Sequence, residues 1–281
     1  MSATGMTMTA LENPALRVLS FGGGVQSTAM LLMALHREIG PLPDAVIMAD
    51  TGWEGVRTYA HVEWTREQVN RMTNGQVQFI VTSGGNIRED QIRQSQGAEG
   101  RVAAVPYFTA NGGRGMRQCT SEYKLEPLTQ AQRGLLGVMK GSRVPAGTQV
   151  EVWIGISTDE IIRAKHAAKP WQVNRFPLIE AGISRNDCRS WLEAKGYPQP
   201  PKSACVGCPY HDDWQWADMA RNAPADFADA CEVDDIIRRG NSKMTNDQFT
   251  HRSLRPLRDV KFAGVENGDL FDADCEGMCG L

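Results

Sequence analysis

Long apolar runs and an excess of basic residues are both missing from this chain of 281 residues. No stretch approaches the roughly 18 consecutive apolar residues that a bilayer span needs, so the sequence predicts no membrane-spanning segment. Residues 1–16 contain no basic segment followed by a long apolar one, so we expect no signal peptide and a cytoplasmic location. With 30 Lys and Arg against 33 Asp and Glu, the net charge of −3 argues against a surface coated with basic residues for nucleic acid.

Two familiar phosphate-binding patterns are also absent, although glycine is concentrated near the N-terminus. Residues 20–29 read SFGGGVQSTA, with neither the GK[ST] ending of a P-loop nor a GxGxxG pattern. Because Gly22, Gly23 and Gly24 carry no Cβ, their N–H groups can turn toward an anion. A helix that begins near Ser27 would add its positive N-terminal end. We expect a phosphate at this loop; the alternative is a tight strand-to-helix turn without a ligand.

Apolar segments alternate with segments of helical periodicity in the first part of the chain. The pattern predicts strands at residues 17–20, 44–50, 77–84 and 150–158, and helices at residues 27–40, ending at Gly40, and 54–71. This alternation predicts an α/β fold with a parallel sheet covered by helices on both faces. We expect a nucleotide-binding α/β core over residues 1–183, followed by a cysteine-bearing C-terminal lobe and tail over residues 184–281.

Small and polar residues follow each of the four expected strands, at Ser20 and at residues 50–52, 83–84 and 155–157. In parallel α/β sheets, ligands gather at the carboxyl ends of the strands. These four strand ends fit one shared site. Later in the chain, residues 97–115 read as a loop and residues 184–196 as a helix capped by Ser184. Residues 197–210 contain four prolines, which break regular structure.

The sequence has no expected disulfide framework, although it contains seven cysteines, because a reducing cytosol favours metal or redox chemistry. Cys205 and Cys208 form a CxxC pattern in which Gly207 permits the tight turn that brings two thiolates to one metal centre. This pattern suits an iron–sulfur cluster or a zinc ion. Cys188 and Cys231 fall in helical patterns and are expected in the core. The remaining cysteines are Cys119, Cys275 and Cys279.

Histidine and tryptophan give little information about a site. The five histidines show no ligand spacing, and His211, just after the CxxC pattern, is expected at the surface. Trp214 and Trp216 could frame a base, but we expect both to pack.

Four segments, in order along the chain, resemble the motifs of one superfamily. Residues 22–27, GGGVQS, resemble the SGGxDS pyrophosphate loop of the adenine nucleotide α-hydrolase superfamily. Three later segments resemble its phosphoadenylyl sulfate (PAPS) reductase branch: DTGWE at 50–54, RQCTSEYKLEPL at 117–128 and GISTDEIIR at 155–163. The chain resembles the PAPS reductase-like proteins and the related DNA-phosphorothioation sulfurtransferases, which implies a Rossmann-like core.

The resemblance also implies roles for individual residues. Gly22, Gly23, Gly24, Gln26, Ser27 and Gly155 would surround the phosphate, and Asp50 and Thr51 would contact the ribose or the adenine edge. Lys124 and Arg163 would neutralise the anion. A 4Fe–4S cluster would be held by Cys119, Cys205 and Cys208, with Cys275 as the first choice for the fourth ligand, then Cys279 and Cys231. Cys279, near the end of the chain, would be the nucleophile or else a ligand.

The chain departs from the family pattern in the pyrophosphate loop, in the Gly155 segment and in the cysteine motif. Gly22 replaces the first Ser of the loop motif, and Gln26 replaces its Asp, so position 26 brings no negative charge to a magnesium ion. Ser157 stands where the reductases have Arg, and Gln118 precedes Cys119 where they have a doubled Cys. Magnesium stays a candidate ion at the site.

Two functions of different classes follow from these features. The first is an enzyme that transfers sulfur or reduces a sulfonucleotide, with ATP or a sulfated adenylate as its ligand. Such an enzyme would work with a sulfur or electron donor protein, a thiolated nucleic acid is one candidate acceptor, and no membrane is involved. The alternative is a non-catalytic nucleotide-binding module with a structural zinc, in which Gln26 and Ser157 mark the loss of catalytic charges.

Overall fold

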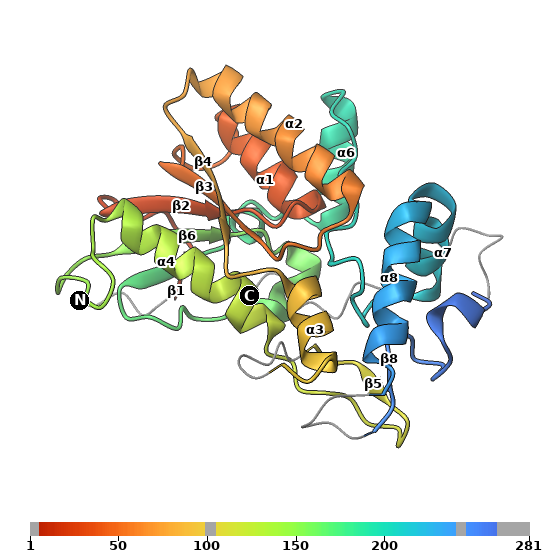
Figure 1. Ribbon diagram of the computed structural model, residues 1–281. Helices are drawn as coiled ribbons and strands as arrows, with labels where there is room; N and C mark the ends of the chain where they lie inside the picture. The colour runs from red at the N-terminus through yellow and green to blue at the C-terminus, as the bar shows by residue number, and fades with distance from the viewer. Residues whose placement is uncertain (1–5, 99–104, 240–245, 263–281) are drawn as a thin grey trace.

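The computed structural model describes residues 6–98, 105–239 and 246–262. Its centre is one sheet of parallel strands in the order β1-β7-β6-β2-β3-β4, with helices on both sides (Figure 1). The predicted parallel α/β fold, of Rossmann-like architecture, is confirmed. The strands are β1 (Met6–Thr7), β2 (Leu16–Ser20), β3 (Ala45–Asp50), β4 (Gln78–Ser83), β6 (Val150–Ile154) and β7 (Gln172–Arg175).

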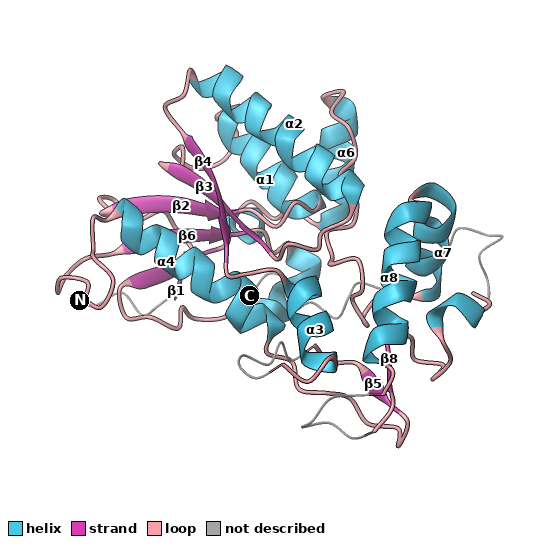
Figure 2. Ribbon diagram, in the orientation of Figure 1, coloured by secondary structure: helices cyan, strands magenta, loops and turns pink. Residues whose placement is uncertain are grey.

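The inner strands of the sheet are buried on both faces, and alternate residues along them point to opposite sides. Leu19, Val46 and Met48 pack against α1 (Val25–Leu35), α2 (Val56–Thr73) and α6 (Arg185–Ala194) in one apolar cluster. The residues between them, such as Val18 and Ile47, pack in a second cluster with α4 (Glu126–Leu135). Figure 2 shows these helices lying on the two sides of the strands.

A smaller helical region lies beyond the carboxyl ends of the strands (Figure 1). It contains α3 (Ile87–Ser95), α7 (Asp213–Asn222) and α8 (Pro224–Ile237), which share a third apolar cluster around Trp53, Tyr107 and Trp216. The other elements are β5 (Phe108–Thr109) paired with β8 (Gln248–Phe249), a π-helical turn (Ser121–Leu125), α5 (Pro177–Glu180) and 3₁₀ turns at Thr158–Arg163 and Leu257–Asp259. None of the described helices is long and apolar enough to cross a bilayer.

The boundaries of the predicted helices are only partly correct. α1 ends at Leu35 rather than at Gly40, and Arg37, with φ of 62°, takes the left-handed position after the helix. Gly40 is instead required for packing, because a Cβ there would lie 2.7 Å from the Trp153 ring. α6 has the predicted Ser184 cap, in which the Ser184 side chain and Asp187 form a capping box. The predicted domain boundary between residues 183 and 184 separates α6 from α1. Cys188 and Leu192 of α6 nevertheless pack with α1 in one apolar cluster.

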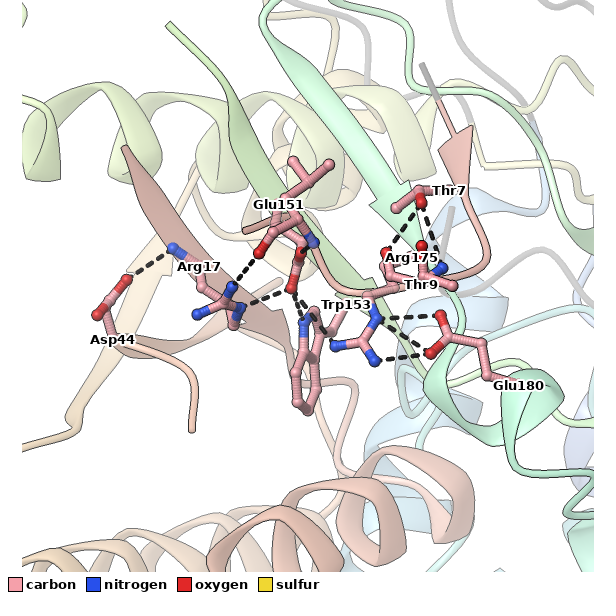
Figure 3. Close-up of polar contacts among 9 residues, drawn as sticks. Thr7, Thr9, Arg17, Asp44, Glu151, Trp153, Arg175 and Glu180 are labelled. Atoms are coloured by element: carbon pink, nitrogen blue, oxygen red, sulfur yellow. Dashed lines mark hydrogen bonds and ion pairs between the residues drawn. The ribbon is translucent and has the colours of Figure 1, made fainter. Parts of the chain in front are cut away.

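A buried carboxylate fixes the register of three adjacent strands at the end of the sheet opposite the carboxyl edge (Figure 3). Glu151 of β6 is fully buried and accepts a 2.7 Å hydrogen bond from Arg17 Nε of β2 and a 2.6 Å bond from Trp153 Nε1. Arg175 Nη1 of β7 lies 3.5 Å away, and Arg175 also pairs with Glu180. Glu151 accepts a further bond from the Leu11 amide, which ties the N-terminal segment to the sheet.

Replacing Glu151 with Gln should lower the free energy of unfolding by about 3 kcal/mol, because two buried guanidinium groups would lose their shared charge. Urea denaturation measures this loss. The matched control is Glu63→Gln, which removes an exposed partner of Arg66 and should change stability by less than about 1 kcal/mol. Equal effects in the two variants would contradict the assignment of Glu151 as a buried charge centre.

Candidate functional site

The glycine loop connects β2 to α1 and leaves the start of that helix without a side-chain cap. Gly24 is the N-cap residue and has no side-chain hydrogen bond to the first turn, while Ser27 Oγ donates to Gly24 O at 3.1 Å. The first N–H groups of any α-helix have no partner inside the helix and carry its positive end. The start of α1 therefore offers N–H donors to an anion, and a phosphate at this loop stays a prediction.

Two glycines bring the loops around this helix start into close contact. Gly155 follows β6, and a Cβ there would lie 2.9 Å from Ser27 N and 3.0 Å from Ser27 Cα, so only glycine allows this approach. Gly23 has φ of 74°, in the left-handed region, and packs beside Thr58 and Ser203. The Ser203 hydroxyl donates a hydrogen bond to Gly22 O, which places the proline-rich connector over the loop.

Behind the loop, a neutral histidine supports α1 and α2. His61 Nε2 lies 3.0 Å from Thr28 Oγ1, and its ring stacks between Phe21 and Trp64. Burial lowers the pKa of His61 to about 4, so the ring is uncharged at neutral pH. The residues that support α1 at this point are therefore uncharged at neutral pH.

A cavity of about 360 Å³ opens in front of the glycine loop. The candidate residues that line it are Gly22, Gly24, Gln26, Ser27, Lys124, Gly155 and Arg163. Further cationic side chains also line it, namely Arg57, Arg185, Arg189 and Lys202, and the acidic ones are Glu54, Glu160, Asp218 and Asp226. A protein of net charge −3 thus concentrates cationic groups around one cavity, which suits an anionic ligand.

Gln26 and Ser157, two of the positions at which the chain departs from the pattern it resembles, are hydrogen-bonded to each other; Gln26 lines this cavity, and Ser157 is buried and does not. Gln26 Nε2 donates to Ser157 Oγ at 3.3 Å and to Glu160 Oε2 at 2.7 Å. Arg163 Nη1 lies 2.6 Å from Glu160 Oε1. A neutral amide and a hydroxyl therefore stand together where the family pattern has Asp and Arg, and Arg163 is held at the cavity wall by Glu160.

Asp50, Thr51 and Gly23 do not line this cavity in the described part of the chain. Asp50 Oδ1 accepts hydrogen bonds from Gly52 N at 2.8 Å and from the Tyr59 hydroxyl at 2.9 Å, so it fixes the turn after β3. Burial, with Asp50 nearby, raises the pKa of Tyr59. Thr51 lies against the cysteines instead. A direct contact of Asp50 or Thr51 with ribose or adenine stays a prediction.

A second, smaller cavity of about 40 Å³ lies beside the first and is lined by three cysteines, Cys119, Cys205 and Cys208. Thr51, Trp53, Arg117, Thr120 and Tyr210 complete much of its wall. Tyr107 is buried close by, and burial together with nearby acidic groups, these three cysteines included, raises its pKa well above the usual value. The two sequence segments with the cysteines thus meet, as the resemblance implied.

The CxxC loop is locked to the turn after β3. Val206 N donates to Trp53 O at 2.8 Å, and Cys205 pairs with Glu54 in an antiparallel bridge. A Cβ on Gly207 would overlap the Trp53 indole, so glycine is required for this contact as well as for the turn. The Cys205 thiol lies 3.2 Å from Thr51 Oγ1 and 3.8 Å from Glu54 Oε1.

Lys124 lines both cavities. Lys124 lies in the π-helical turn at Ser121–Leu125, which begins two residues after Cys119. Lys124 Nζ is 4.0 Å from Glu54 Oε1, while Glu54 Oε2 is buried with no hydrogen-bond partner in the described residues. Lys124 and Glu54 therefore form the wall between the cavities.

The metal ligands proposed from the sequence are only partly covered by the structure. Cys275 and Cys279 lie outside the described residues. Within the described ranges, no group of three or more His, Cys, Asp or Glu side chains is arranged to hold a single metal ion. Cys188 and Cys231 are buried in apolar clusters, as predicted, and burial raises their thiol pKa values to about 12 and about 11. Such thiols are poor nucleophiles and ligands.

Several lining residues were missed or misjudged from the sequence. Trp216 is fully buried as expected, but Trp214 is 41% exposed and lines the larger cavity, because residues two apart on a helix face opposite sides. His211, expected at the surface, packs its ring on Trp216 at 4.6 Å, and its Nε2 lies 3.0 Å from Cys205 O. Arg185 and Arg189 also line the larger cavity. Their i,i+4 spacing places them one turn apart on the same face of α6, and this could have been recognised from the sequence.

No model of a known protein family matches the chain, and no curated protein matches it. The likeness of residues 22–27 to the superfamily loop, and of the three later segments to the PAPS reductase branch, stays a prediction.

Replacing Gly155 with Ala should weaken binding of ADP at least about tenfold, since the added Cβ would displace the first turn of α1 by contact with backbone. Isothermal titration calorimetry measures the affinity. Gly134→Ala is the matched control, because nothing lies within 4 Å of its added Cβ and alanine favours the α4 helix. Unchanged affinity in the Gly155 variant would mean that the start of α1 does not bind the phosphate.

Proposed function

We propose that this protein is an adenine-nucleotide-dependent enzyme that transfers sulfur or reduces a sulfonucleotide, similar to the PAPS reductases. The observation that carries the proposal is that a cationic cavity at a helix N-terminus adjoins a cavity lined by three thiols, with Lys124 in the wall of both. Neither cavity alone would indicate sulfur chemistry. Their contact brings an anionic ligand next to sulfur or redox groups.

In this proposal the nucleotide lies in the larger cavity with a phosphate against the glycine loop. Backbone N–H groups at the start of α1 would donate to phosphate oxygens. Arg163, held by Glu160 at 2.6 Å, and Lys124 would neutralise charge that develops on the leaving phosphate. Since Lys124 also reaches the thiol cavity, the charged end of the nucleotide would point toward the cysteines.

The three thiols that meet in the smaller cavity are the basis for proposing an iron–sulfur cluster there, with a structural zinc as the alternative. Within the described residues, no group of three or more His, Cys, Asp or Glu side chains is arranged to hold a single metal ion, so either centre would take a further ligand from outside them. Cys119, Cys205 and Cys208 surround one small cavity, with apolar Trp53, Ile87 and Val105 in its wall. A 4Fe–4S cluster bound there would supply electrons or hold sulfur. Its fourth ligand would come from Cys275, which the structure does not describe.

Two reactions of the superfamily are compatible with this arrangement. In one, ATP is cleaved between its α and β phosphates to adenylate an oxygen, and a sulfur nucleophile then displaces AMP. In the other, a thiolate attacks the sulfur of a sulfated adenylate, the sulfur–oxygen bond breaks, and the nucleotide leaves. The Cys279 thiol is our candidate nucleophile. A donor protein for sulfur or electrons and a nucleic-acid acceptor belong to the same proposal.

The alternative of a zinc-bearing binding module is weakened by the contact between Gln26 and Ser157. The loss of the motif Asp and the loss of the motif Arg suggested that catalytic charges had been shed. Gln26 and Ser157 hydrogen-bond to each other at 3.3 Å. Compared with the pattern that the chain resembles, one negative side chain (Asp) and one positive side chain (Arg) are therefore replaced together by neutral ones. The net charge at the loop is then preserved, and Arg163 still faces the cavity.

Replacing Cys208 with Ser should abolish the iron content and visible absorbance of the cluster, because one of three neighbouring thiolates is removed. ADP binding, which depends on the other cavity, should change by less than about threefold. Cys188→Ala is the control, since Cys188 is buried against α1 and should not affect iron content. Intact cluster absorbance in the Cys208 variant, with protein purified without oxygen, would remove the cluster from this site.

A further inference from the structure

The hydrogen bonds of Gln26 reveal how the loop end of the larger cavity is kept electrically balanced. Its side-chain nitrogen donates to Glu160 at 2.7 Å, and it is the second residue of α1, two positions after the last glycine of the loop. Glu160 is only 8% exposed, so its charge needs partners inside the protein. Gln26 supplies one partner and Arg163, at 2.6 Å, supplies the other.

Both oxygens of Glu160 are therefore occupied by donors of the protein itself. Oε2 accepts from the Gln26 amide and Oε1 from the Arg163 guanidinium. A magnesium ion is held by carboxylates and by phosphates in octahedral geometry at about 2.1 Å, and a carboxylate already bound to a guanidinium is a poor ligand. The amide of Gln26, which presents its nitrogen here, adds no negative charge for a cation.

The other carboxylates that line the cavity stand on other elements. Glu54 follows β3, on the far side of β2 from Glu160; its Oε1 lies 4.0 Å from Lys124 Nζ, and its Oε2 has no hydrogen-bond partner among the described residues but is buried away from solvent. Asp218 pairs with Arg57 at 3.0 Å, and Asp226 accepts from Val56 N at 2.9 Å. Among the described residues, no group of three or more His, Cys, Asp or Glu side chains is arranged to hold a metal ion. The residues present do not fit a magnesium ion at the phosphate.

We infer that this site binds its nucleotide without a divalent cation, and that Gln26 is the positioning residue that makes this possible. By holding Glu160, the Gln26 amide orients Arg163 toward the cavity, where the guanidinium and the α1 N–H groups take the place of a metal. The inference rests on the proposed function and deepens it. A metal-free phosphate site favours a ligand that arrives already activated, a sulfated adenylate, over ATP cleavage assisted by magnesium.

Position 26 also determines whether a cation is needed. A carboxylate there, as in Gln26→Asp, would face Glu160 and repel it, and the pair would create the ligands that the wild-type site lacks. A neutral side chain of similar length, as in Gln26→Met, would release Glu160 without adding charge. The two variants separate the loss of positioning from the gain of a cation requirement.

The experiment is calorimetric titration of the full chain with ADP, in EDTA and in excess magnesium. For the wild type, the two dissociation constants should agree within about threefold. Gln26→Asp should bind at least about tenfold more weakly in EDTA and recover in magnesium, and Gln26→Met should weaken equally in both buffers. Thermal melting of each variant checks that it is folded.

Two outcomes would overturn the inference in different ways. Binding of ADP by the wild type only in magnesium would show that the site uses a cation, and the proposed nucleotide function would survive. An absence of binding in both buffers would remove the proposed function and this inference with it. Identical behaviour of the Asp and Met variants would show that charge at position 26 does not control metal dependence.

Discussion

Close approach of backbones at the carboxyl edge of the sheet is the constraint on which the candidate site depends. The segment after β6 comes so near to the start of α1 that a Cβ on Gly155 would lie 2.9 Å from Ser27 N. The CxxC loop meets the turn after β3 where Gly207 packs against the Trp53 indole, a contact that a Cβ would also prevent. Each contact is possible only because a side chain is missing. Together they bring segments far apart in the sequence to one edge.

These contacts explain why the two cavities act as one candidate site. The CxxC loop is hydrogen-bonded to the turn after β3, and the cysteines that it carries line the cavity beside the one at the start of α1. Lys124, in the π-helical turn at Ser121–Leu125, lines both cavities. Glu151 fixes the opposite end of the sheet through Arg17 and Arg175. The sheet thus positions the loops that line both cavities.

Much of the core could be predicted because its signals are local. Alternation of strands and helices, the glycine triplet and the Ser184 cap each depend on neighbouring residues. The side-chain partners could not be predicted, since they join segments more than a hundred positions apart, as Gln26 joins Glu160. Nor does a single sequence reveal that Asp50 fixes a turn while Trp214 faces a cavity. Both depend on how helices pack, which local periodicity does not determine.

The central claim is that a nucleotide site adjoins an iron–sulfur site, and metal analysis of the wild-type protein tests it most directly. The protein would be purified without oxygen, and its iron, acid-labile sulfide and zinc would be measured together with its visible spectrum. The account predicts about four irons and four sulfides per chain and a coloured protein. One zinc per chain with no iron would contradict it, because the three thiols would then serve a structural ion.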